Sequence, residues 1–101
     1  MKRVAYISGP MTGLPDNNYP AFDRVAAYLR ARGYQVESPA EATPPTCGTW
    51  LGWMRGAICK MMKCDIVVML PEWGASRGAT IERQLAIDLG IEVVTLAELT
   101  D

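Results

Sequence analysis

The stretch that decides the fold is "DIVVMLPEWGASRGATIERQLAIDLGIEVVTL", residues 65–96. After Asp65 come five successive apolar residues, which predict a buried strand over Asp65–Leu70. Residues 71–78 hold one Pro and two Gly and predict a loop. A helix is expected over Ala79–Leu89, where Gly90 ends it, and a further strand over Ile91–Leu96. This order of elements indicates parallel strands joined by a right-handed crossover.

The upstream half repeats the alternation of strand and helix. Residues 3–8 predict a strand, and Asn18 is expected to cap a helix that has Pro20 in its first turn and Gly33 at its end. The apolar stripe of this helix is expected to be Phe22, Val25, Ala26 and Leu29. Residues 34–38 predict a second strand, and Thr49 is expected to cap a second helix. The apolar face of that helix is Trp50, Met54, Ala57, Ile58 and Met61. Residues 97–101 are expected to form a short tail.

These elements predict the fold class: an α/β protein with a small three-layer parallel sheet of flavodoxin or Rossmann type. The length of 101 residues suits a single domain over residues 1–101. In such sheets, ligands bind outside the carboxyl ends of the strands, where the winding reverses. The loops that leave the first and third strands, "GPMTG" (residues 9–13) and "PEWGASRG" (residues 71–78), are therefore expected to converge on one crevice.

Composition excludes several classes of protein. The net charge is −1 and the isoelectric point about 5.4, unlike the basic footprint of a nucleic-acid binder. There is no His, and the three Cys have no metal-like spacing, so neither a metal nor a cofactor is expected. No segment resembles a signal peptide or a membrane span, and an odd Cys count favours a reduced, cytoplasmic location. A chain this short, with an apolar surface at Trp50, Trp53 and Met54, is expected to form a homodimer or higher homo-oligomer.

Glu82 is the sharpest candidate for chemistry. It shares a helical face with the apolar Leu85, Ala86 and Leu89, and no cation lies at helical spacing from it. A carboxylate that faces a core needs compensation or a function, and the nearby helix N-terminus is expected to keep it ionised and nucleophilic. The alternative is a first-turn glutamate that reaches solvent past the sheet edge, and the pattern alone does not decide between the two.

The two loops offer binding groups, each with a structural alternative. Gly9 and Gly13 permit unusual backbone conformations, so their loop could hold an anion or could simply be a strand-to-helix turn. Ser76 could cap the following helix or bind a ligand, and Gly78 would let a ligand approach the backbone. Tyr6 is either a core aromatic or a hydroxyl that reaches the crevice.

Taken together, four motifs resemble one known family. "YISGPMTGLPDNNYPAF", "SPAE", "CDIVVMLPEW" and "SRGATIERQLAIDLGIEVV" are similar to DUF4406 proteins, which are common in phages and prophages and belong to the nucleoside 2-deoxyribosyltransferase-like superfamily. The resemblance implies that Glu82 attacks C1′ of a deoxynucleoside, expels the base and leaves a glycosyl-enzyme. It also implies that Ser76 binds a 5′-phosphate, that Tyr6 belongs to the site, and that one loop lines the sugar and phosphate pocket. That loop is Gly9, Pro10, Met11, Thr12 and Gly13.

One position departs from the superfamily pattern. Active members carry an aspartate eight residues before the aspartate that starts the third strand, and here that position is Ala57. The missing carboxylate is implicated in protonating or orienting the leaving base; Glu72 or Glu41 could replace it, or both could be solvated loop residues.

Three hypotheses follow from the sequence. The first is an enzyme that cleaves or transfers at the N-glycosidic bond of a deoxynucleoside or its 5′-monophosphate, with Trp73 packed on the base. The second is a non-catalytic nucleotide-binding module of phage origin, and the third is an interaction protein that uses its Trp/Met helix.

Overall fold

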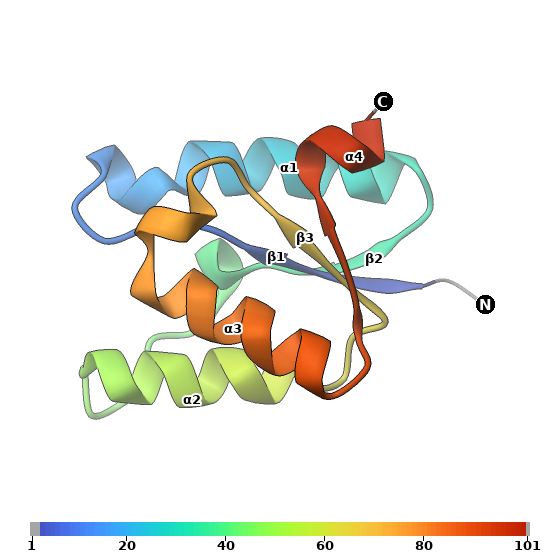
Figure 1. Cartoon of the computed structure of the whole chain (residues 1–101). Coiled ribbons are helices and arrows are strands. Elements are labelled where there is room, and N and C mark those ends of the chain that lie inside the picture. The colour runs from blue at the N-terminus through green and yellow to red at the C-terminus, as the bar shows by residue number, and fades with distance from the viewer. Residues whose placement is uncertain (1–2, 101) are drawn as a thin grey trace.

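The computed structural model describes residues 3–100 as a four-stranded, all-parallel sheet with helices on both faces (Figure 1). The strand order is β2-β1-β3-β4, so the chain winds outward in both directions from the central pair β1 and β3. The strands are β1 (Val4–Ser8), β2 (Gln35–Glu37), β3 (Ile66–Met69) and β4 (Glu92–Thr95). The helices are α1 (Tyr19–Ala31), α2 (Trp50–Met61), α3 (Arg77–Asp88) and α4 (Leu96–Thr100), with short 3₁₀ turns η1 (Pro15–Asn18), η2 (Pro39–Glu41) and η3 (Trp73–Ala75). The predicted α/β class and parallel sheet are confirmed.

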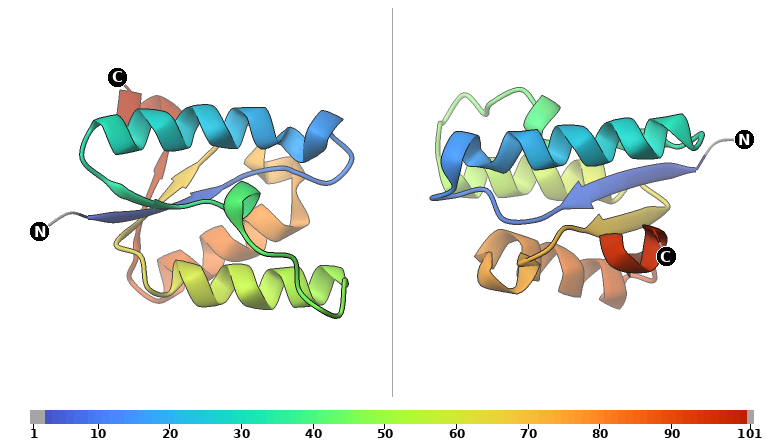
Figure 2. Two further views of the ribbon diagram at one scale, coloured as in Figure 1. Left: turned by 180° about the vertical axis from the view of Figure 1, so that it is seen from behind. Right: turned by 90° about the horizontal axis from the view of Figure 1, so that it is seen from above.

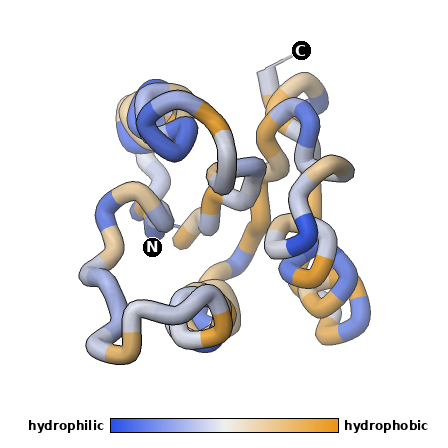
Figure 3. The backbone as a smooth tube through the Cα atoms, turned by 90° about the vertical axis from the view of Figure 1, so that its left-hand side faces the viewer, coloured by the Kyte–Doolittle hydropathy of each residue, from blue (hydrophilic) through white to orange (hydrophobic). Residues whose placement is uncertain are grey.

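Helices α1 and α4 cover one face of the sheet, and α2 and α3 cover the other (Figures 1 and 2). The first three helices carry both hydrophilic and hydrophobic positions, as helices between a core and solvent do (Figure 3). β3 is buried at all four residues because it lies between β1 and β4 with a helix layer on each side. Among the helices of residues 3–100, none combines the length and apolar composition that a membrane span requires.

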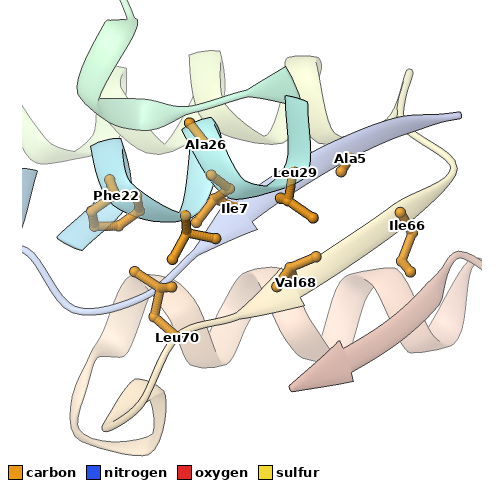
Figure 4. Close-up of a cluster of buried hydrophobic side chains, with 9 residues drawn as sticks. Ala5, Ile7, Phe22, Ala26, Leu29, Ile66, Val68 and Leu70 are labelled. Carbon is orange, nitrogen blue, oxygen red and sulfur yellow. The ribbon is translucent and has the colours of Figure 1, made fainter. Parts of the chain in front are cut away.

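The core of the face under α1 is built from apolar side chains. Ala5 and Ile7 of β1 pack with Ile66 and Val68 of β3 against the buried stripe of α1 (Figure 4). That stripe is Phe22, Val25, Ala26 and Leu29, as the sequence predicts. Full burial of a side chain such as Phe22 or Leu29 stabilises the fold by roughly 1.5–3 kcal/mol, so this layer supplies a large part of the stability of a small domain.

Three local predictions are wrong. Asn18 has a left-handed backbone (φ 62°) and makes no side-chain cap to α1; its Nδ2 instead donates to the Pro10 carbonyl at 2.9 Å. α3 begins at Arg77 rather than Ala79, because Ser76 caps it by accepting a hydrogen bond from the Ala79 N–H. Residues 97–100 belong to helix α4 rather than to an irregular tail, and Asp101 lies outside the described residues.

Candidate functional site

A cavity of about 570 Å³ lies at the carboxyl end of β1, bordered by α2 and by the start of α3. Its lining comes from Tyr6, the loop 9–12, the turn that enters α1, Pro39 after β2, one side of α2, and residues 75–79 with Glu82. The sheet brings these segments together because β1 and β3 are parallel neighbours whose carboxyl ends share one edge. The two loops expected to converge therefore do meet around one hollow.

Glu82 lies in the wall of this cavity with only 5% of its surface exposed. Its Oε2 accepts a hydrogen bond from the Tyr6 hydroxyl at 2.6 Å, and its Oε1 accepts one from the Ser8 hydroxyl at 2.7 Å. Within residues 3–100, neither of the observed ion pairs involves Glu82. Two neutral hydroxyls, rather than a cation, therefore hold the carboxylate in place, and it does not reach solvent past the sheet edge.

The period of a strand explains why both hydroxyls reach the same carboxylate. Tyr6 and Ser8 are two residues apart in β1, so they point to the same face, opposite to Ala5 and Ile7. Ser8 was not among the predicted site residues. A polar side chain two positions from Tyr6, at the end of an otherwise apolar strand, is the signal that could have identified it.

Burial and hydrogen bonding act on Glu82 in opposite directions. Burial, the larger influence, raises the pKa of the carboxyl above its ordinary value, while the hydrogen bonds from Tyr6 and Ser8 lower it. The pKa of Tyr6 is raised too, by burial first and then by the charge of Glu82. Loss of hydration therefore disfavours the ionised form of Glu82, which the helix N-terminus was expected to favour. The hydrogen bonds from the two hydroxyls compensate for part of that loss.

The loop after β1 contains two glycines, and each position favours glycine for a different structural reason. Gly13 has a φ of +82°, which other residues rarely adopt. Gly9 has no such need, but a Cβ placed there would come within 2.7 Å of the Leu70 Cβ. Gly9 therefore allows the loop to pass close over the end of β3, which brings Pro10, Met11 and Thr12 to the cavity.

The segment that enters α1 is strained. Asp16, Asn17 and Asn18 all have left-handed backbones, with φ of 52°, 53° and 62°. Each such residue outside glycine costs of order 1–3 kcal/mol, although Asn and Asp adopt this conformation most readily. The bond from Asn18 to the Pro10 carbonyl holds this turn against the loop, and Asn17 lines the cavity beside it.

The start of α3 forms another side of the cavity. Ser76 acts as the N-cap, one of its two predicted roles, and Gly78 has a packing reason of its own: a Cβ there would lie 3.0 Å from the Met54 Sδ of α2. The Arg77 guanidinium lies over the Trp50 ring, with its central carbon 4.3 Å from the ring centroid. This contact joins α2 to α3 at the cavity.

Most predicted site residues line this one cavity. They are Tyr6, Gly9, Pro10, Met11, Thr12, Ser76, Gly78 and Glu82. Gly13 is not part of the lining. Trp73 is not part of the lining either. Trp73 and Arg83 line a second hollow, where the central carbon of the Arg83 guanidinium lies 4.6 Å from the centroid of the Trp73 ring.

The aromatic wall comes instead from α2, through Trp50 and Trp53, which the sequence placed in a core or an interface. Ala57 also lines the cavity, so the position that departs from the superfamily pattern faces the predicted site. The two candidate substitutes lie elsewhere. Glu72 is exposed and outside the lining, and Glu41 pairs with Arg30 at 2.7 Å.

The fold and site define a small three-layer α/β protein with a buried carboxylate beside a cavity at the switch point of its sheet. The family model described as "Domain of unknown function (DUF4406)" matches residues 3–95, and the chain belongs to that family. No curated protein matches the chain.

Proposed function

We propose that this protein cleaves or transfers at the N-glycosidic bond of a deoxynucleoside or deoxynucleoside 5′-monophosphate, with Glu82 as the nucleophile. The observation that carries the proposal is the buried Glu82 carboxylate, held by the Tyr6 and Ser8 hydroxyls in the wall of a cavity large enough for a nucleoside. A carboxylate without a cation partner, at the carboxyl end of a parallel sheet, is unfavourable for stability alone and is typical of a reactive group.

The proposed reaction has two steps. Glu82 attacks C1′ as the bond to the base breaks, and the electron pair of that bond leaves with the base. Water, or a second base in a transfer reaction, then displaces the carboxylate from C1′. A carboxylate suits this role because it stabilises an oxocarbenium-like transition state and can then bond to it.

The two hydroxyls have a definite part in this reaction. A carboxylate has about four lone-pair directions, so one hydrogen bond on each oxygen leaves a lone pair free for attack. Tyr6 and Ser8 also fix the orientation of the carboxylate, which lowers the entropy cost of reaching the reactive geometry. Because only ionised Glu82 is a nucleophile, activity should fall as pH decreases through its raised pKa.

The rest of the cavity offers binding groups for the remainder of such a substrate. The loop at Gly9–Thr12 and the start of α3 with Ser76 and Gly78 are proposed to contact the sugar and any 5′-phosphate. Trp50 and Trp53, rather than Trp73, supply flat apolar surface for a base.

The decisive experiment is the release of free base from deoxynucleosides and their 5′-monophosphates. Glu82→Gln should lower the rate by about 10³-fold or more, because the amide keeps the shape and cannot attack C1′. Glu72→Gln is the matched control, since Glu72 is exposed, lies outside the cavity lining and should react at the wild-type rate. Equal base release by wild type and Glu82→Gln would contradict the proposal.

A non-catalytic nucleotide-binding module is the second candidate, and the presence of Ala57 in the cavity wall favours it. On this alternative the same nucleotides raise the melting temperature without any release of base. Base release that depends on Glu82 excludes this alternative.

The wider assignments rest on the sequence resemblance. We propose membership of the nucleoside 2-deoxyribosyltransferase-like superfamily, a phage or prophage origin and a cytoplasmic location. We also propose a homodimer or higher homo-oligomer, because a chain of 101 residues buries only a modest core by itself. Light scattering after size exclusion tests the oligomer, and a monomer at high concentration would contradict it.

A further inference from the structure

The cavity lacks a group suited to protonate a leaving base. Within residues 3–100, its ionisable lining side chains are Tyr6, Tyr19, Arg77 and Glu82. Tyr6 already donates its hydroxyl proton to Glu82, and guanidinium groups do not give up a proton in proteins. The remaining group, Tyr19, is a phenol, and phenols are much weaker acids than the carboxylic acids that protonate leaving groups in glycosidic cleavage. Glu82 itself must be ionised to act as the nucleophile. No second carboxyl, Lys or Cys belongs to this part of the lining.

The α2 wall is poor in polar groups as well. It presents Trp50, Trp53, Met54 and Ala57, whose only polar side-chain atoms are the indole nitrogens and the Met54 sulfur. A neutral base leaves C1′ as an anion unless an acid protonates it, and such an acid typically contributes a factor of about 10²–10⁴. A base that already carries a positive charge leaves as a neutral molecule and needs no acid.

We propose, on the premise that Glu82 is the nucleophile, that the substrate of this cavity is an N-glycoside with a cationic base, such as an N7-alkylated purine deoxynucleoside. Its positive charge supplies the partner that the Glu82 carboxylate lacks among residues 3–100, and the Trp50 and Trp53 rings offer faces for a cation.

Arg77 is the one cation of the lining within the described residues, and its charge opposes that of such a base. Arg77 is exposed, so solvent and salt screen its repulsion, whereas Glu82 is 5% exposed and is screened much less. Attraction to Glu82 therefore outweighs repulsion from Arg77. Arg77 also suits a 5′-phosphate on the same ligand, so the test includes nucleoside and 5′-monophosphate forms.

The reaction balances without a proton donor. A carboxylate oxygen of Glu82 bonds to C1′ while the bond from C1′ to the ring nitrogen breaks, and its electron pair cancels the positive charge of the base. Water then attacks C1′, the bond to Glu82 breaks and its electron pair returns to the carboxylate. The products are a neutral base, the free deoxysugar and one proton released to solvent.

A matched pair of substrates tests the proposal. N7-methyl-2′-deoxyguanosine and 2′-deoxyguanosine differ by one methyl group and one charge, and both are assayed at pH 6 with and without a 5′-phosphate. Spontaneous release is subtracted, and Glu82→Gln measures what remains without the nucleophile. The expected result is a Glu82-dependent kcat/KM about 100-fold or more higher for the cationic substrate.

Adding an acid to the α2 wall should change this preference. Ala57→Asp should raise base release from 2′-deoxyguanosine by 10-fold or more. It should therefore reduce the ratio of kcat/KM for the N7-methyl substrate to kcat/KM for 2′-deoxyguanosine. Ala57→Asn has a similar shape but cannot protonate the base as an acid, so it should change neither value. Melting curves establish that both variants fold; where Ala57→Asp does not, the wild-type ratio decides alone.

The outcomes separate the two proposals. Glu82-dependent release from 2′-deoxyguanosine as fast as from its N7-methyl form overturns the cationic-base inference and leaves the proposed function standing. No Glu82-dependent release from either substrate, in either phosphorylation state, overturns the proposed function and this inference with it.

Discussion

The two faces of the sheet differ in what they bury. The face under α1 and α4 is closed by apolar side chains, whereas the face under α2 and α3 buries a carboxylate and opens into a cavity. One strand contributes to both, because β1 alternates between Ala5 and Ile7 on the first face and Tyr6 and Ser8 on the second. Four consecutive residues, Ala5–Ser8, thus alternate between the apolar core and the candidate site, and substitutions on the two faces should have different consequences.

The largest effect is expected on the closed face. Phe22→Ala removes a fully buried ring from the α1 stripe and should lower the free energy of unfolding by about 3–5 kcal/mol. Most small domains have only about 5–15 kcal/mol in total, so urea denaturation should show a greatly lowered midpoint. Ala21→Gly, at a half-buried neighbour on the same helix, should cost only about 1 kcal/mol and serves as control. Equal midpoints for Phe22→Ala and wild type would show that this face is not the main source of stability.

A smaller effect, dependent on pH, is expected from Tyr6→Phe on the open face. The ring still fills its place, but Glu82 loses one of its two hydrogen bonds, at a cost of about 1–3 kcal/mol near pH 7. The lost bond favoured the ionised carboxyl, so the pKa of Glu82 should rise further in the variant. Below that pKa the carboxyl is neutral and the cost should shrink.

Denaturation at pH 7 and at pH 4 checks this expectation. Ser8→Ala removes the other hydrogen bond to Glu82 and should behave in the same way, which makes it the matched comparison. If Tyr6→Phe lowers the free energy of unfolding equally at pH 7 and pH 4, the hydroxyl does not stabilise the protein through the ionised form of Glu82.

Glu82→Gln should stabilise the protein at neutral pH while it removes the proposed activity. The folded pKa of Glu82 lies above its unfolded value, so its contribution to stability is fully present below the unfolded pKa and is lost as pH rises through the folded pKa. Gln has no charge to lose hydration, and its amide can accept from Tyr6 and donate to the Ser8 oxygen. The free energy of unfolding of the variant should therefore increase relative to wild type as pH rises. The increase should be about 1.4 kcal/mol for each unit by which the folded pKa of Glu82 exceeds its unfolded pKa.

Thermal unfolding of both proteins between pH 4 and pH 8 measures this gain. The two melting temperatures should approach each other at low pH and separate towards neutral pH. If the variant were less stable than wild type at pH 7, the interactions of the Glu82 carboxylate would more than offset its loss of hydration, which would contradict this expectation.

Sequence reasoning predicted the layers and selected Glu82 as a candidate because both depend on local spacing. The apolar run at Ile66–Leu70 and the stripe of α1 predicted a buried strand and the helix face that covers it. The helical face of Glu82 left open whether its carboxylate points inward or to solvent, and the structure buries it. Partners across the sheet were harder, since the bond from Ser8 to Glu82 joins residues 74 positions apart. Trp73 was misplaced because it begins the 3₁₀ turn Trp73–Ala75 and lines a second hollow, whereas Ala75 at the end of the same turn lines the cavity. No sequence period reports the path of such a turn.

The smallest effect is expected at Glu41, a glutamate in the layer of α1 that differs from Glu82 in its exposure and in having a cation as its partner. Glu41 is exposed and accepts two hydrogen bonds from Arg30, which hold its pKa below the ordinary value. Its stabilisation is therefore present above the unfolded pKa and is lost as pH falls through the folded pKa, opposite in sign to Glu82. Solvent screening limits the cost of Glu41→Gln to about 0.2–1 kcal/mol at pH 7, and added salt should reduce it. The same glutamate-to-glutamine change should thus destabilise the closed face and stabilise the open one at neutral pH, and two variants that shift stability in the same direction would remove the distinction between the faces.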